Sequence, residues 1–274
     1  CKNNASELRP DLVISFGKSL ISKNLKLFLR AGSNIHHWHI QEDGYVADTF
    51  QSLNRILRCA PKAFFKMLVE TEVIHSDDSY VKKWQDLDKK ASTVLHSWAG
   101  EAVFGEMSAT AMILQHMPAD TDLHLANSMS VRYANIWGIK QENIRVFSNR
   151  GTSGIDGCNS TAVGSALATK RNTLLISGDL AFFYDRNGLW HPHLPKNLKI
   201  VVMNNAGGGI FRLIDGPYRQ PDYLKYFETP HHLRAQTCAE EMGLQYLAAK
   251  SREELEKCLP LFFEDFSKPA ILEV

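Results

Sequence analysis

The chain has 274 residues, and its 31 lysines and arginines nearly balance its 30 aspartates and glutamates, for a formal net charge of +1. That balance argues against the basic surface that binding to nucleic acid or to an acidic membrane requires. Hydrophobic residues make up 44% of the chain, as in ordinary globular proteins. No apolar run approaches the ~18 residues of a transmembrane helix, so we expect a globular protein without a membrane span.

The cysteines argue against a disulfide framework and against a cysteine-based zinc site. There are five, an odd number, they lie far apart, and no CxxC pair occurs. This usage is typical of a reducing compartment, so we expect a cytoplasmic protein. The chain begins with Cys1 rather than Met and shows no signal-peptide pattern, so we expect a piece or a processed form of a longer protein.

The first 76 residues predict a partial α/β unit, too short to be a complete α/β domain. A buried strand over 12–16 precedes a helix over 22–29, and an amphipathic helix is expected over 46–59. The polar segment 34–45 between the two helices is expected to be a loop. It holds His36, His37 and His39, for which no carboxylate or cysteine partner has metal-ligand spacing.

Residues 79–116 have helical spacing of their apolar side chains, and the charged stretch 77–97 predicts a helix that links two domains. The second domain is expected over 98–274. In it, short continuous apolar runs alternate with helical segments, which predicts a doubly wound, three-layer parallel α/β sheet. The expected strands are 123–127, 144–148, 173–178, 199–205 and 270–274, and the expected helices are 128–137, 160–170, 232–242 and 251–265.

Polar, cationic or glycine-rich residues follow four of these strands, at the edge where doubly wound sheets bind ligands. They are Ser128 and Arg132 after the first strand, Arg150 and the loop GTSGIDG after the second, Gly178 and Asp179 after the third, and NNAGGG from Asn204 after the fourth. The side-chain oxygens of Asp179 and Asn205 are hard donors that suit magnesium. The glycines would admit a phosphate, and a helix starting near Ser160 or Thr161 would favour a diphosphate at its free N–H groups.

The pairs Gly178-Asp179 and Asn204-Asn205, with Asn205 26 positions after Asp179, resemble the diphosphate-binding motif of thiamine-diphosphate enzymes. The common motif is Gly-Asp-Gly, and this chain has Leu180 in place of its second glycine. With that leucine and the following F-x-x-D-x-N, the chain resembles the 2-succinyl-5-enolpyruvyl-6-hydroxy-3-cyclohexene-1-carboxylate synthase family of menaquinone biosynthesis. The segments ANSMSVRYAN (126–135), FSNRGTSGIDGCNSTAVG (147–164), NNAGGGIF (204–211) and ETPHHL (228–233) carry the same resemblance. The first 75 residues match loosely, as the tail of that family's middle domain.

The resemblance implies a set of site residues. Asp179, Asn205 and the Gly207 carbonyl would bind Mg²⁺ or Mn²⁺, while Gly154 and Gly178 would contact thiamine diphosphate and Ile155 would hold it bent. Substrate carboxylates would be held by Ser128, Arg132 and Arg150, and an apolar wall would be formed by Ile210, Phe211 and Ile214. Lys23 matches a substrate-facing lysine of the middle domain, although Asn24 follows it where some members have arginine.

The implied reaction is decarboxylation of 2-oxoglutarate followed by conjugate addition of the resulting carbanion to isochorismate. The family's catalytic glutamate belongs to a preceding pyrimidine-binding domain, so we expect no such residue in this chain and no catalysis by the chain alone. The family also implies a homodimer or homotetramer with active sites shared between subunits.

Two alternatives stay open: another thiamine enzyme, such as an acetolactate synthase or a 2-oxo acid decarboxylase, and a non-catalytic fragment. A nicotinamide-binding domain fits less well because no GxGxxG follows the first strand. The roles of His231 and His232 stay open.

Overall fold

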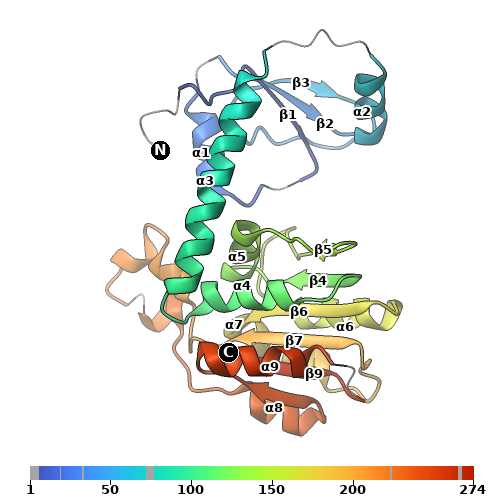
Figure 1. Ribbon diagram of the computed structural model, residues 1–274, viewed down its shortest axis with the longest axis vertical. Coiled ribbons are helices and arrows are strands. Elements are labelled where there is room, and N and C mark those ends of the chain that lie inside the picture. Colours follow the sequence, from blue (N-terminus) through green and yellow to red (C-terminus); the bar gives the residue numbers. More distant parts are fainter. Residues whose placement is uncertain (1–5, 19, 33, 72–76, 223, 265–266) are drawn as a thin grey trace. The chain divides into compact units, whose positions relative to one another are not determined.

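The computed structural model describes residues 6–18, 20–32, 34–71, 77–222, 224–264 and 267–274. The chain divides into two compact units, Cys1–Gly100 and Glu101–Val274, each with its own parallel sheet (Figure 1). No helix in these ranges combines the length and the apolar character that crossing a membrane requires.

The first unit has a three-stranded parallel sheet in the order β1-β2-β3. Its core is small and is formed by Leu29, Ile35 and Phe50. The elements are β1 (Leu12–Phe16), α1 (Lys23–Arg30), β2 (His36–Ile40), β3 (Leu53–Leu57), α2 (Pro61–Glu70) and α3 (Ser79–Glu101).

The loop predicted over 34–45 is wrong for His36–Ile40, which form β2. His37 and His39 alternate onto one face of that strand and are both buried. The hydroxyl of Ser15 on β1 hydrogen-bonds to both rings, at 2.6 Å from His37 Nε2 and 2.9 Å from His39 Nδ1. A polar partner on the neighbouring strand thus allows two histidines to occupy buried strand positions.

The predicted helix over 46–59 is also wrong, because this stretch contains a turn followed by β3. The Asp48 carboxylate accepts hydrogen bonds from the backbone N–H groups of Ser52 and Leu53, and Gln51 has a left-handed φ of 59°. These local bonds compete with helix formation, and pairing with β2 then completes the backbone bonding of β3.

The helical pattern predicted over 79–116 is confirmed, and it is divided between two helices. α3 ends at Glu101, and α4 (Glu106–His116) begins after the extended residue Gly105. The Ser108 hydroxyl accepts a hydrogen bond from the Gly105 N–H, which is the cap that starts the second helix. Glu106 is therefore the first residue of α4, in the second unit.

The second unit confirms the predicted doubly wound fold. Its six parallel strands have the order β5-β4-β6-β7-β9-β8. From β4 the chain adds β5 on one side and then crosses to add β6 on the other side, so the switch point of the sheet lies between β4 and β6. The strands are β4 (Thr121–Leu125), β5 (Arg145–Phe147), β6 (Asn172–Gly178), β7 (Leu198–Met203), β8 (Gln245–Ala248) and β9 (Ala270–Glu273). Five of them were predicted, whereas the short β8 was not.

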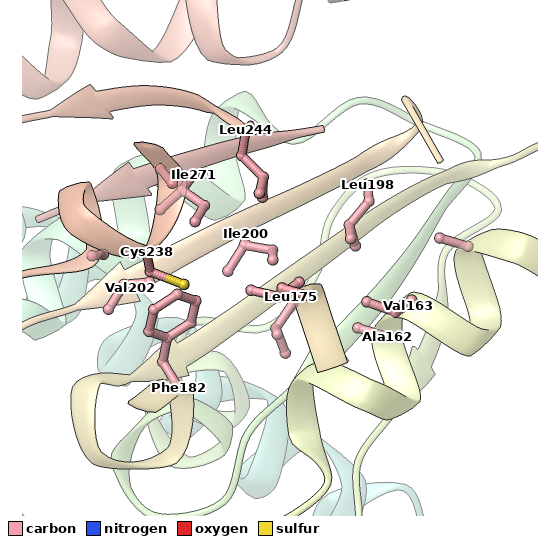
Figure 2. Close-up of a cluster of buried hydrophobic side chains, with 14 residues drawn as sticks. Ala162, Val163, Leu175, Phe182, Leu198, Ile200, Val202, Cys238, Leu244 and Ile271 are labelled. Carbon is pink, nitrogen blue, oxygen red and sulfur yellow. The ribbon is translucent and has the colours of Figure 1, made fainter. Parts of the chain in front are cut away.

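The helices cover both faces of this sheet. Besides α4 they are α5 (Met129–Trp137), α6 (Cys158–Ala168), α7 (Asp179–Tyr184), α8 (Ala235–Met242) and α9 (Arg252–Phe262). On one face, α6, α7 and α8 pack Val163, Phe182 and Cys238 against Ile200 of β7 (Figure 2). Lys199, the neighbour of Ile200, points to the other face, where its ammonium bonds to the Glu264 carbonyl beyond α9. This alternation, with both faces buried, explains why the strands read as continuous apolar runs.

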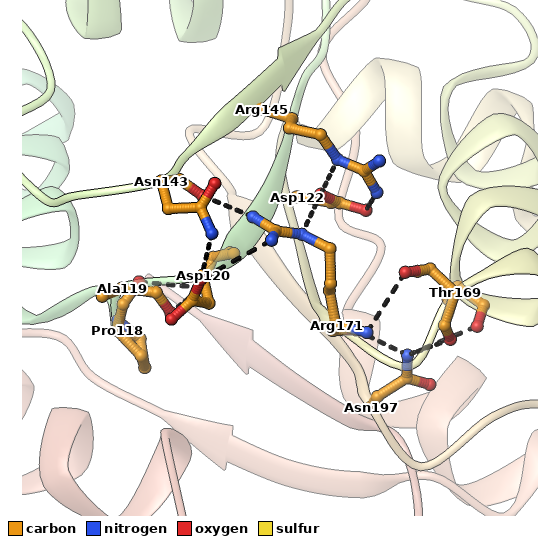
Figure 3. Close-up of polar contacts among 11 residues, drawn as sticks. Pro118, Ala119, Asp120, Asp122, Asn143, Arg145, Thr169, Arg171 and Asn197 are labelled. Atoms are coloured by element: carbon orange, nitrogen blue, oxygen red, sulfur yellow. Dashed lines mark hydrogen bonds and ion pairs between the residues drawn. The ribbon is translucent and has the colours of Figure 1, made fainter.

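The amino-terminal ends of the strands are held by a polar network around Asp122 of β4 (Figure 3). This carboxylate is fully buried, and both of its oxygens accept hydrogen bonds from Arg145 of β5. Arg171, just before β6, donates to it across 2.8 Å. These bonds lower the pKa of Asp122, Arg145 contributing most. The network lies at the opposite edge of the sheet from the residues that follow the strands.

Candidate active site

A cavity of about 550 Å³ lies where four adjacent strands end, in the order β5-β4-β6-β7. Because these strands are parallel, the residues that follow them meet at one edge of the sheet, beside the switch point between β4 and β6. Twelve of the thirteen predicted site residues line this cavity. They are Ser128, Arg132, Arg150, Gly154, Ile155, Gly178, Asp179, Asn205, Gly207, Ile210, Phe211 and Ile214.

Asp179 and Asn205, which follow β6 and β7, meet at one backbone N–H group. The N–H of Gly207 lies 2.9 Å from Asp179 Oδ2 and 3.0 Å from Asn205 Oδ1 and donates to both. Oδ1 of the aspartate accepts a second bond from the Leu180 N–H across 2.6 Å. Burial raises the pKa of Asp179, and these backbone bonds oppose the rise. Two oxygen-bearing side chains are thus held together at the edge of the cavity.

A second carboxylate, Glu106 at the start of α4, lies beside this pair. It lines the cavity and accepts a hydrogen bond from the side-chain amide of Asn205. Burial raises the pKa of Glu106, the Asn205 bond opposes this, and the charge of Asp179 raises it further. The charge of Asp179 thus disfavours ionisation of the neighbouring Glu106.

Arg132 and Arg150 place two guanidinium groups at the same cavity. Arg150 donates to the Asn127 side-chain oxygen across 2.8 Å, while its Nε is buried without a hydrogen-bond partner. Burial lowers the pKa of Arg132, and the nearby charge of Arg150 lowers it further. Like charges placed together in a partly buried site favour an anionic ligand, and guanidinium groups match carboxylates in shape.

Ser128 has an unusual backbone, with φ 74° and ψ −126°. Only glycine adopts this region readily, and such residues cluster at functional sites. Its carbonyl accepts a hydrogen bond from Arg132 one turn later. The strained residue thus lies at the end of β4, on the cavity, next to one of the two arginines.

The loop after β5 is held by Asn127. The amide of that side chain donates to the carbonyls of Asn149 and Gly154, across 2.8 Å and 2.6 Å. Ile155, the next residue, packs against a small buried group of Ala126, Cys158 and Ala181. These contacts fix Ile155 at the cavity wall.

The predicted anion site at the start of α6 lies outside the described lining of the cavity. α6 begins at Cys158, and the N–H of Ser160 donates to Asp185 Oδ2 across 2.7 Å, while the Ser160 hydroxyl donates to Oδ1 across 2.8 Å. This carboxylate after α7 thus occupies one of the N–H groups that were expected to bind a diphosphate.

The two histidines with open roles differ in environment. His231 is largely buried, and its Nε2 lies 3.2 Å from Asp179 Oδ2 without the direction of a hydrogen bond. The Leu233 N–H donates to His231 Nδ1 across 3.1 Å, so Nε2 carries the proton of the neutral ring. His232 is exposed and is not among the described residues that line the cavity.

Residues 128–274 match the family described as thiamine pyrophosphate enzyme, C-terminal TPP binding domain. The chain belongs to the thiamine pyrophosphate enzymes. Residues 2–125 match the middle domain of thiamine pyrophosphate enzymes. In this family the second unit is the part that binds thiamine pyrophosphate, in agreement with the cavity at its strand ends.

Curated relatives of this thiamine pyrophosphate enzyme carry the name 2-succinyl-5-enolpyruvyl-6-hydroxy-3-cyclohexene-1-carboxylate synthase. The protein from Cytophaga hutchinsonii is 45% identical over 98% of this chain and 48% of its own length. Those from Flavobacterium johnsoniae and Porphyromonas gingivalis are each 39% identical, over 98% and 97% of this chain and 48% of their own lengths. The chain thus spans about half the length of the curated relatives it matches.

The residues present fit a metal-bound diphosphate. Asp179 and Asn205 supply hard oxygen donors, and the Gly207 carbonyl accepts only a 3.2 Å bond from Gly209 in the described structure, which leaves it capacity for a cation. No group of three or more His, Cys, Asp or Glu that could hold a metal occurs among the described residues. A cation here would depend on amide, carbonyl and phosphate oxygens, as magnesium sites commonly do.

The predicted site residues differ from the lining of the cavity in two respects. Lys23 begins α1 in the first unit and is exposed, and the cavity described above belongs to the second unit. Sequence reasoning also missed several residues of the lining. They include Glu106, Asn127, Tyr133, Ser153 and Met203. For Glu106 the sequence offers no signal, because a carboxylate in the first turn of a helix is ordinary.

Proposed function

We propose that this chain forms the diphosphate-binding half of a 2-succinyl-5-enolpyruvyl-6-hydroxy-3-cyclohexene-1-carboxylate synthase. The reaction is the decarboxylation of 2-oxoglutarate and conjugate addition to isochorismate, in menaquinone biosynthesis. The names of the relatives support this assignment. The observation that carries it is the meeting of Asp179 and Asn205 at the Gly207 N–H, beside two cavity arginines.

Asp179, Asn205 and the Gly207 carbonyl would hold Mg²⁺ or Mn²⁺, and through it the diphosphate of the cofactor. When bound, thiamine diphosphate supplies the electron sink that decarboxylation of a 2-oxo acid needs. Gly154 and Gly178 would approach the cofactor with bare backbone, and Ile155 would support its shape from the wall where it packs. The protein contributes binding and orientation rather than the electron chemistry itself.

The charge and shape of the cavity support the proposed substrates. Arg132 and Arg150 would bind carboxylates of 2-oxoglutarate and isochorismate, with Ser128 beside them. Isochorismate also carries an apolar ring face, against which Ile210, Phe211 and Ile214 would pack. Lys23 would add a further contact. The full enzyme would work in the cytoplasm as a homo-oligomer whose subunits share active sites.

The test is activity of the intact protein, including any sequence beyond these 274 residues. We expect the synthase product from 2-oxoglutarate and isochorismate, and we expect Asp179→Ala to abolish both product formation and Mg²⁺-dependent binding of thiamine diphosphate in calorimetry. Full activity in that variant would remove the role of Asp179. Turnover of pyruvate without any use of 2-oxoglutarate would instead indicate a different thiamine enzyme.

A further inference from the structure

A carboxylate outside the proposed ligand set controls the orientation of one proposed ligand. An asparagine binds a cation only through its oxygen, so its amide must not be flipped. In this structure Glu106 accepts from the Asn205 Nδ2, which only a nitrogen can supply, and the Gly207 N–H donates to the Asn205 Oδ1, which only an oxygen can accept. The two bonds together select one orientation of the amide.

We propose that Glu106 is a positioning residue, which holds the Asn205 amide so that its oxygen stays on the side of Asp179. This inference rests on the proposed metal–diphosphate role of Asp179 and Asn205. The residues are distant in sequence, since Glu106 begins α4 and Asn205 follows β7. Second-layer hydrogen bonds of this kind orient metal ligands, and their loss typically weakens metal binding.

The surroundings of the amide support the same role. A β-carbon at Gly209 would lie 3.1 Å from Asn205 Nδ2 and would press on the amide, so the glycine there leaves room for it. Asn205 is itself exposed rather than packed in the core. With little packing to hold it, the orientation of this side chain depends on its hydrogen bonds.

The competing explanation is that Glu106 only stabilises the start of α4. A carboxylate in the first helical turn interacts favourably with the helix dipole. That role would affect thermal stability, but it would leave metal affinity unchanged in folded protein. Stability and metal affinity must therefore be measured separately.

The experiment uses Mn²⁺ titration of the intact protein in the presence of thiamine diphosphate, followed by electron paramagnetic resonance of the free ion. Glu106→Asp keeps the charge and the favourable helix position but withdraws the acceptor by one methylene group. Glu106→Gln loses the charge but keeps an acceptor at the same reach. We expect Glu106→Asp and Glu106→Ala to lower the Mn²⁺ affinity about 10–100-fold, and Glu106→Gln to retain most of it.

Controls separate the possible outcomes. Glu256→Ala, at an exposed position of α9, should leave the affinity unchanged, and thermal unfolding of each variant checks that it is folded. Equal loss in Glu106→Gln and Glu106→Ala, or no loss in Glu106→Asp, would overturn the positioning role. Asp179→Ala tests the proposed metal site itself, and an unchanged Mn²⁺ affinity in this variant would refute the proposed function. If Asp179→Ala lowers the Mn²⁺ affinity but the Glu106 variants do not, only the role of Glu106 is refuted.

Discussion

Asp179 and Gly207 are joined by a hydrogen bond of 2.9 Å from the glycine N–H to Oδ2 of the aspartate. The bond connects the residue that follows β6 to the loop that follows β7. Because the same N–H also donates to Asn205, one backbone group sets the spacing of two proposed metal ligands. The position of this loop is therefore as important to the site as the ligand side chains.

Replacing Gly207 tests the position of the loop. A β-carbon there would lie 2.9 Å from the Glu228 carbonyl oxygen, a backbone atom that cannot move cheaply. We expect Gly207→Ala to displace the N–H and to weaken Mn²⁺ binding with thiamine diphosphate on the order of tenfold or more. Gly164→Ala on α6 is the control, since a β-carbon there meets no atom within 4 Å. Equal affinities in the two variants would contradict the expectation.

The two cavity arginines should determine selectivity for substrates with a second carboxylate. We expect Arg132→Met or Arg150→Met to weaken use of 2-oxoglutarate by about 2 kcal/mol or more, on the order of 30-fold in kcat/KM. Pyruvate, which lacks the second carboxylate, should be affected much less. Arg186→Met, at an exposed position away from the described lining, is the control. A parallel loss for both substrates would show that the arginines serve the fold rather than recognition.

Two substitutions of Ser128 distinguish the effect of backbone strain on stability from the effect of the hydroxyl on substrate binding. The φ of 74° with ψ −126° at Ser128 suits glycine, so Ser128→Gly should raise the free energy of unfolding by roughly 1–3 kcal/mol, whereas Ser128→Ala keeps the strain. Both variants lose the hydroxyl and should raise the KM for 2-oxoglutarate. Urea unfolding followed by circular dichroism, together with steady-state kinetics, checks both effects. A stability gain in Ser128→Ala equal to that of Ser128→Gly would refute the strain.

The Asp122 network should make stability depend on pH. Its folded-state pKa is lowered by the bonds from Arg145 and Arg171, so its contribution is present above the unfolded pKa of about 3.9 and is lost as pH falls through the folded value. We expect Asp122→Asn to cost roughly 1.5–3 kcal/mol near pH 7. In urea titrations the difference between variant and parent should shrink below about pH 3.9. A constant difference down to low pH would contradict this.

The strands that precede the site residues could be predicted from the sequence, because they are buried in the centre of the sheet. β6 and β7 are buried on both faces, so nearly every residue from Leu174 to Ile176 and from Leu198 to Met203 is apolar. Parallel strands place their following residues at one edge. This rule was enough to predict that Asp179 and Asn205 lie near one another.

The mispredicted elements were those decided by partners elsewhere in the chain. The strand β2 needed the Ser15 hydroxyl as a partner for its buried histidine rings, and β3 pairs with β2 after a turn held by the Asp48 carboxylate. Their local patterns were polar or helical, and sheet pairing overrode them. Short strands such as β8 carry too few residues for a pattern.

The doubly wound fold and the polar residues that follow its strands can be predicted from the sequence, because burial of a parallel sheet leaves continuous apolar runs along the chain. The hydrogen bonds among those polar groups could not be predicted in the same way. The Ser160 N–H donates to Asp185, and the Asn205 amide donates to Glu106. A hydrogen bond depends on the distance and direction between two groups that can be remote in sequence, and a pattern along the chain does not encode these.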